Sequence, residues 1–162
     1  ENVLAAITIG SFFNVSDKKI VEAVENYKPD NNRSQIRNTD KDNLLYMDFY
    51  NANPSSMNLA IESFSKIKND KPNVFILGDM LELGNVAEQE HLKIIQKLKI
   101  LNADKVFLVG NTFKKVNSEQ SFKTYNDSKE LANYLKEHNI NISNILIKGS
   151  RGIKLDVIID LL

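Results

Sequence analysis

Three short runs of consecutive apolar residues constrain the fold of this 162-residue chain more strongly than any other feature. They lie at residues 74–77, 106–109 and 145–147. A strand with one wet face alternates polar and apolar residues, whereas a strand covered on both faces is apolar throughout. These runs therefore predict the buried strands of a mainly parallel sheet with helices on both of its faces.

Segments with helical periodicity separate the predicted strands. The strands are expected at residues 44–50, 73–77, 105–109, 122–125 and 144–148, and the helices at 55–68, 86–101, 127–138 and after Arg151. Strands that alternate with helices through short turns predict the α/β class. Right-handed crossovers then bring the carboxyl ends of the strands to one edge of the sheet.

Residues 1–30 follow a different pattern. A small apolar helix opens the chain and is expected to end near Gly10, and a second helix runs from a cap at Ser16 to Tyr27. Pro29 ends this second helix, and a polar linker follows. Two such helices need a partner to cover their apolar surface. We expect residues 1–30 to be the tail and linker of a preceding domain, and residues 31–162 to form the α/β domain.

Charge and composition argue against several classes of function. Lys plus Arg equal Asp plus Glu at 21 each, so no net positive charge favours nucleic acid. The absence of cysteine excludes a disulfide framework and a thiolate metal site. No apolar run approaches the roughly 18 residues of a membrane span. Because no secretory signal opens the chain either, we expect a cytoplasmic protein.

The turn after the first predicted strand carries an acid, a tyrosine and two amides. They are Asp48, Tyr50, Asn51 and Asn53. Pro54 suits the start of the following helix, with Ser55 or Ser56 as its cap. Ligands of open α/β sheets bind at such strand-to-helix turns, which makes this turn a candidate binding site. The alternative is an ordinary polar loop.

A second candidate turn follows the last predicted strand. Lys148 ends that strand, and Ser150 and Arg151 lie between two glycines at the start of the terminal helix. Backbone N–H groups at a helix start favour an anion, and an arginine binds carboxylate or phosphate through paired hydrogen bonds. We therefore expect an anion here. Solvated basic groups at a plain turn are the alternative.

The loop after the second predicted strand supplies two acids. Asp79 and Glu82 could bind an ammonium group, a ribose or the waters of Mg²⁺. Alternatively, Asp79 caps its own loop and Glu82 is solvated. Arg33 in the linker could reach a phosphate across a domain boundary, or could simply be solvated. His91 and His138 have no partner at metal-ligand spacing, so no role is assigned to them.

The chain lacks the local motifs of several common enzymes. It has no Gly-rich Lys-Ser/Thr phosphate loop and no Gly-x-Gly-x-x-Gly dinucleotide fingerprint. It also lacks the Gly-x-Ser-x-Gly turn of hydrolases. The residues alone therefore indicate a ligand-binding α/β domain of a larger protein, with an edge suited to anions and amines.

Four motifs together resemble the C-terminal, Rossmann-like domain of the Mur ligase family. They are Asn32-Arg33-Ser34-Gln35 and the segments 48–57, 77–84 and 148–152. The resemblance covers essentially the whole chain, because residues 2–7 resemble the closing helix of the family's central, ATP-binding domain. The Tyr-Asn-Ala-Asn-Pro run and the Gly-Ser-Arg-Gly turn point to the branch that adds D-alanyl-D-alanine to UDP-N-acetylmuramoyl-tripeptide in peptidoglycan precursor synthesis.

The resemblance implies a mechanism and a set of partners. Enzymes of this family use ATP and Mg²⁺ to phosphorylate a carboxylate, and an amine then attacks the acyl phosphate. The phosphate loop and the Mg²⁺ ligands belong to the central domain, and an N-terminal domain holds the UDP-sugar. Both are expected to be missing here, so the chain alone is expected to be inactive, with no catalytic residue and no metal ligand of its own.

The same resemblance assigns roles to the candidate residues. Binding of ATP is implied for Arg33, Asp48, Tyr50, Asn51 and Asn53. Binding of D-Ala-D-Ala is implied for Asp79, Glu82, Lys148, Ser150 and Arg151. Two alternatives stay open: the C-terminal domain of another Mur ligase or of a folylpolyglutamate synthase-type enzyme, which takes a different amine, and a non-catalytic α/β ligand-binding module.

Overall fold

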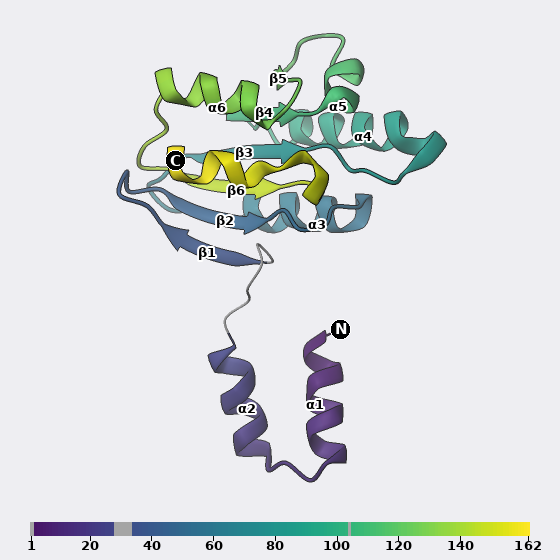
Figure 1. Ribbon diagram of the computed structural model, residues 1–162, viewed down its shortest axis with the longest axis vertical. Coiled ribbons are helices and arrows are strands. Elements are labelled where there is room, and N and C mark those ends of the chain that lie inside the picture. The colour runs from purple at the N-terminus through teal and green to yellow at the C-terminus, as the bar shows by residue number, and fades with distance from the viewer. Residues whose placement is uncertain (1, 28–33, 104) are drawn as a thin grey trace. The chain divides into compact units, whose positions relative to one another are not determined.

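The computed structural model describes residues 2–27, 34–103 and 105–162 and is drawn as a ribbon in Figure 1. The chain divides into two compact units, Glu1–Asp30 and Asn31–Leu162. Each unit is a separate body, described here by itself.

The first unit is a hairpin of two helices, α1 (Asn2–Phe12) and α2 (Asp17–Asn26). The prediction that α1 ends near Gly10 is wrong. Gly10 lies inside the helix, and a side chain there would meet Ile20 of α2 at 3.0 Å. The turn comes later, at Asn14, whose φ of 56° is left-handed. Because glycine has no side chain, α1 and α2 can approach each other closely at Gly10.

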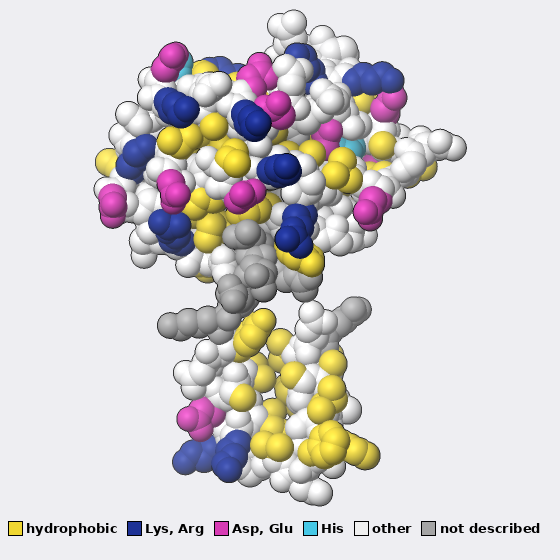
Figure 2. Space-filling view, viewed as in Figure 1, with side chains coloured by type: hydrophobic (Ala, Val, Ile, Leu, Met, Phe, Trp, Pro, Cys, Tyr) yellow, Lys and Arg dark blue, Asp and Glu magenta, His cyan; other side chains and the backbone are white. Residues whose placement is uncertain are grey.

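Apolar side chains cover much of this hairpin (Figure 2). Helix α1 buries none of its residues, and α2 buries only Ile20. Leu4 is 69% exposed, Phe12 77% and Phe13 70%. An exposed apolar surface of this kind marks an interaction face. This exposure fits the prediction from the sequence that the hairpin needs a partner to cover it.

The second unit is built on a six-stranded sheet in the order β1-β2-β6-β3-β4-β5. The strands are β1 (Gln35–Asn38), β2 (Leu44–Asp48), β3 (Asn73–Gly78), β4 (Lys105–Val109), β5 (Lys123–Tyr125) and β6 (Asn144–Lys148). Strands β2 to β6 run parallel, and β1 pairs with β2 antiparallel. The predicted α/β class and mainly parallel sheet are confirmed. Strand β1 is not among the predicted strands, because a four-residue edge strand with an exposed Ile36 has little apolar pattern.

Helices connect these strands. They are α3 (Pro54–Ser65), η1 (Gly84–Val86), α4 (Ala87–Ile100), α5 (Asn111–Val116), α6 (Ser128–Glu137), η2 (Arg151–Ile153) and η3 (Leu155–Leu161). Helix α5 is absent from the predictions because six residues are too few to show a period. The terminal segment after Arg151 is helical as expected, but it consists of tighter 3₁₀ turns.

Two apolar cores lie on opposite faces of the sheet. Residues of β2, β3 and β6 such as Leu45, Ile76 and Ile147 pack with Leu131 of α6 and Ile158 of η3. The alternate residues of the same sheet pack with α3, α4 and α5 on the other face. From the sheet, this second core includes Phe75, Leu77, Leu108 and Leu146, and from the helices Met57, Ile61, Ile94, Leu98 and Phe113. Figure 1 shows the two sets of helices on the two sides of the sheet. Both faces of the strands are therefore dry, which explains their unbroken apolar runs.

No helix in residues 2–27, 34–103 and 105–162 is both long and apolar enough to cross a membrane.

Candidate functional site at the carboxyl edge of the sheet

Strand β6 brings the predicted site residues together. It lies between β2 and β3, and its last residue, Lys148, is in register with Asp48 on one side and Leu77 on the other. The chain leaves β2 and β3 toward α3 and α4 on one face, whereas it leaves β6 toward η3 on the other. Such a change of direction opens a crevice at the carboxyl edge of the sheet. We call this edge, formed by residues 48–53, 78–84, 110–113 and 148–152, the rim.

Lys148 and Asp48 form an ion pair at the centre of the rim. The Lys148 Nζ donates to Asp48 Oδ2 at 2.5 Å and to the Asn51 carbonyl oxygen at 3.4 Å. The side chain of Lys148 is 1% exposed and that of Asp48 is 33% exposed. The lysine charge is thus balanced inside the protein, and Asp48 keeps access to the rim. Asp48 is predicted to bind ATP and Lys148 to bind D-Ala-D-Ala, so the pair joins one residue from each predicted set.

Asn53 caps helix α3. Its Oδ1 accepts the backbone N–H of Ser56 at 2.8 Å, and its own N–H donates to Ser56 Oγ at 3.2 Å. This reciprocal pair is a capping box, with Pro54 in the first turn. The expectation that Ser55 or Ser56 caps the helix is therefore wrong, because Ser56 occupies the third helical position. The Oδ1 of Asn53 is engaged locally, whereas the neighbouring Asn51 is exposed.

Arg151 lies over the ring of Tyr50. Its guanidinium carbon is 5.4 Å from the ring centroid, within the range of a cation–π contact. Arg151 is exposed and Tyr50 is partly buried. Because Arg151 is exposed, its guanidinium stays accessible to solvent. Among the cations predicted for the site, Arg151 is better placed than Lys148 to bind an anion directly.

Asp79 is buried and binds the start of helix α5. Its carboxylate accepts the N–H groups of Thr112 at 2.8 Å and Phe113 at 2.9 Å. Burial alone would raise the pKa of Asp79. The two N–H donors favour the charged carboxylate, and the pKa lies below its ordinary value. This geometry matches the alternative in which Asp79 caps a loop, although the loop it caps follows β4 and not β3.

Ser150 joins the β6 turn to the β3 loop. Its Oγ accepts the N–H of Leu81 at 2.9 Å, and its own N–H donates to the Asp79 carbonyl oxygen at 3.1 Å. The two turns approach so closely that a side chain at Gly149 would come within 2.9 Å of the Gly78 Cα. Glu82, by contrast, is exposed on the outer part of its loop with a φ of 66°.

Arg33 lies outside the described residues. Within the described ranges, no group of three or more His, Asp or Glu side chains converges as a metal site would. The rim thus supplies hydrogen-bond donors, acceptors and one exposed guanidinium, a set suited to a polar organic ligand with an anionic group.

Comparison with known proteins decides the family. The model described as "Mur ligase, glutamate ligase domain" matches residues 32–151, which is most of the chain. The chain belongs to the Mur ligase family.

Two curated relatives of this Mur ligase domain carry the same name. The chain is 30% identical to the UDP-N-acetylmuramoyl-tripeptide–D-alanyl-D-alanine ligase of Bacillus subtilis, and the match covers 98% of the chain and 36% of the relative. It is 36% identical to the ligase of the same name from Buchnera aphidicola, over 98% of the chain and 35% of the relative. The chain thus spans about a third of the length of these relatives.

Solved structures of the family share the fold. A crystal structure of MurF from Acinetobacter baumannii superposes with a TM-score of 0.84 at 26% identity, covering 99% of this chain and 36% of that one. MurF from Thermotoga maritima in complex with ADP gives a TM-score of 0.78 at 19% identity, with the same coverage. At 19% identity, the similarity to the Thermotoga maritima structure shows the fold alone.

Two residues to which the sequence assigned no role help to build the rim of this Mur ligase domain. His91 is fully buried and accepts the N–H of Met80 through Nε2 at 3.0 Å. Gly110 has a φ of 129°, and a side chain there would come within 2.2 Å of the Asp79 carboxyl carbon. Gly110 had a usable signal, since it directly follows a buried strand. His91 had none, because its partner lies eleven positions away across a loop.

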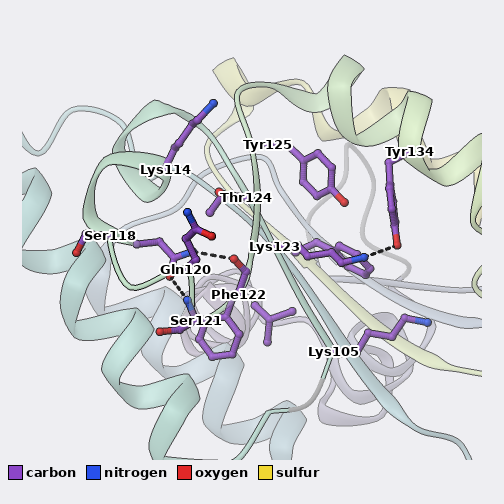
Figure 3. A pocket seen from close by; sticks show the side chains of 13 residues that line it. Lys105, Lys114, Ser118, Gln120, Ser121, Phe122, Lys123, Thr124, Tyr125 and Tyr134 are labelled. Atoms are coloured by element: carbon purple, nitrogen blue, oxygen red, sulfur yellow. Dashed lines mark hydrogen bonds between the residues drawn. The ribbon is translucent and has the colours of Figure 1, made fainter.

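A hollow of about 770 Å³ lies away from the rim, at the open edge of the sheet beside β5 (Figure 3). Its lining includes Lys105, Lys114 and Lys123, and none of the predicted site residues. Lys123 donates to the Tyr134 hydroxyl at 2.7 Å, and Lys114 to Asn126 at 2.7 Å. Of these lysines only Lys123 lies on β5, where a charged side chain protects a short edge strand from pairing with other chains.

Proposed function

We propose that this chain is the C-terminal domain of an ATP-dependent ligase that adds D-alanyl-D-alanine to UDP-N-acetylmuramoyl-tripeptide in peptidoglycan precursor synthesis. One observation carries the proposal. The polar side chains of separate motifs converge on one rim, in a domain similar over 98% of its length to two ligases of that name.

The nucleotide is assigned to the β2 side of the rim. Asp48 is held by Lys148 and partly exposed, so its carboxylate can accept hydrogen bonds from ribose hydroxyls. Tyr50 and Asn51 line the same turn, and Asn53 fixes that turn by capping α3. Arg33 is assigned to the ATP phosphates, where negative charge develops during phosphoryl transfer.

The dipeptide is assigned to the β3 and β6 turns. Arg151 offers an exposed guanidinium to the dipeptide carboxylate. Lys148 holds the Asp48 carboxylate through their ion pair, and Ser150 and Asp79 hold the β3 and β6 turns together. Glu82, exposed on its loop, is the acid available to the incoming ammonium group.

The remaining parts of the reaction are assigned to domains beyond this stretch, since the relatives are about three times as long. By resemblance to the family, Mg²⁺ is assigned to a central domain that also carries the phosphate loop. When bound, Mg²⁺ neutralises charge on the transferring phosphate. An N-terminal domain holds the UDP-sugar, and the apolar α1–α2 hairpin belongs to the central domain. The reaction is placed in the cytoplasm, where ATP is available.

The test is amine-dependent phosphate release by the full-length protein that contains this chain. With ATP, Mg²⁺ and the UDP-tripeptide, D-Ala-D-Ala should stimulate release, and single amino acids such as glutamate should not. Stimulation by another amine alone would favour a different Mur ligase. A gene without an upstream phosphate loop would favour the non-catalytic binding module and overturn the proposal.

A further inference from the structure

The loop after β3 owes its conformation to side chains from other elements. The N–H of Met80 donates to His91 Nε2 of α4 at 3.0 Å, and the N–H of Leu81 donates to Ser150 Oγ at 2.9 Å. Two residues of this segment, Glu82 and Gly84, have left-handed φ values of 66° and 54°. A loop with so little regular structure depends on such anchors for a defined shape.

His91 is the anchor that no predicted role explains. Its ring is fully buried and lies edge-on to Phe113, with the centroids 4.5 Å apart. Nδ1 lies 2.7 Å from the Ala87 carbonyl oxygen, which can only accept a hydrogen. The proton is therefore on Nδ1, and Nε2 is free to accept from Met80. This tautomer makes His91 a directional acceptor, and not merely a packed ring.

The same ring touches the acid that joins two rim loops. His91 Nε2 lies 3.4 Å from Asp79 Oδ1, and the Asp79 carboxylate holds the N–H groups of Thr112 and Phe113. His91 and Asp79 thus form one buried unit between α4, the β3 loop and the start of α5. Glu82 lies two residues beyond the anchored Met80.

We propose that His91 is a positioning residue for the amine substrate. Acting through the Met80 N–H, it holds the loop that presents Glu82 to the rim. This inference rests on the proposed function, since it takes the β3 loop to face D-Ala-D-Ala and the β2 turn to face ATP. It assigns His91 a role toward one substrate in addition to its packing in the core.

The kinetic test compares His91→Phe with His91→Gln in the full-length protein. Phenylalanine fills the space beside Phe113 but cannot accept from Met80, whereas glutamine retains an acceptor. His91→Phe should raise the KM for D-Ala-D-Ala by about tenfold and leave the KM for ATP within about twofold. His91→Gln should recover most of the loss. His138→Phe is the matched control, because His138 caps α6 and stacks on Tyr134, away from the rim.

Hydrogen exchange of the Met80 and Leu81 amides in the 162-residue chain gives a readout that needs no turnover. His91→Phe should speed exchange at Met80 by at least about tenfold, and His91→Gln should restore protection. If the wild-type protein shows no amine-dependent turnover, the proposed function fails while this readout still tests the anchor. Equal rises in both KM values, equal losses in both variants, or unchanged exchange at Met80 would each overturn the role of His91.

Discussion

At the scale of single residues, the ion pair at the centre of the rim joins a buried charge to a partly exposed one. Lys148 is buried and depends on Asp48, whereas Asp48 retains contact with water. An ion pair of this kind adds little net stability, but removing the partner of its buried member leaves an uncompensated charge. Substitution of Asp48 and substitution of Lys148 should therefore change the free energy of unfolding by different amounts.

Asp48→Asn is expected to destabilise the chain more than Lys148→Met. The first change removes the counter-charge of a buried ammonium and should cost about 3 kcal/mol. The second leaves a partly hydrated carboxylate and an apolar side chain in an apolar site, and should cost under about 1 kcal/mol. Urea unfolding of the two variants beside the wild type measures both costs. The opposite ranking would show that Lys148 does not depend on Asp48.

Asp79 should make stability depend on pH in the acid range. Its pKa is lower in the folded chain than the ordinary value of about 3.9. Its contribution is therefore complete above about pH 4 and is lost as the pH falls through the lower folded value. Asp79→Asn should cost about 1–3 kcal/mol at pH 7, and this cost should shrink toward pH 3. Urea unfolding from pH 7 to pH 3 measures it; a cost that does not change with pH would exclude this account.

At the scale of elements, the short helix α5 depends on the rim for its start. Six residues do not form a stable helix alone, and in this helix, which Gly110 precedes as the N-cap, the N–H groups of Thr112 and Phe113 donate to Asp79. The element is therefore a product of the tertiary structure. Its weak point is the glycine, where the backbone is left-handed and a carboxylate occupies the space of a side chain.

Gly110→Ala should destabilise the domain far more than Gly84→Ala. Both glycines have positive φ, but alanine at Gly84, with φ of 54°, costs about 1 kcal/mol, whereas Gly110, at φ 129° and ψ 160°, has a backbone conformation essentially confined to glycine and costs about 1–3 kcal/mol. At Gly110 the new methyl group would also displace the Asp79 carboxylate, while at Gly84 nothing lies within 4 Å. The extra cost at Gly110 should exceed about 2 kcal/mol. Thermal unfolding compares the pair, and equal losses would mean that neither the backbone conformation of Gly110 nor its closeness to Asp79 adds to the cost.

At the scale of the whole molecule, the two compact units differ in completeness. The second unit has two apolar cores built from its own residues, whereas the first exposes most of its apolar side chains. A unit with its own core can fold alone, but an uncovered apolar hairpin cannot hold itself together by burial. The proposed ligase reading explains the contrast, because a central domain would cover the hairpin.

Removal of residues 1–30 should leave the unfolding midpoint of residues 31–162 unchanged within about 2 °C, since neither core includes the hairpin. The longer chain should bind a dye for exposed apolar surface more strongly. Calorimetry and dye fluorescence on the two chains test this pair of expectations. A clear fall in the midpoint would show that the hairpin stabilises the α/β unit.

Local pattern was enough to predict the sheet, its parallel strands and the helices that cover it. Burial on both faces demands continuous apolar runs, and a long helix shows its period within its own sequence. Pattern failed for β1 and α5, which are too short or too exposed to carry a period. It also misplaced the caps at Gly10 and Ser56, because a cap is fixed by the path of the chain on both sides of it.

The sequence by itself determined which strands are buried and that their polar ends meet at one edge, since handedness and burial leave few other arrangements. Only the tertiary structure decided the pairing within that edge. Lys148 with Asp48, His91 with Met80 and Asp79 with α5 each join residues that are separated along the chain. Such partners are chosen by distance and direction in the folded molecule, and spacing along the chain records neither.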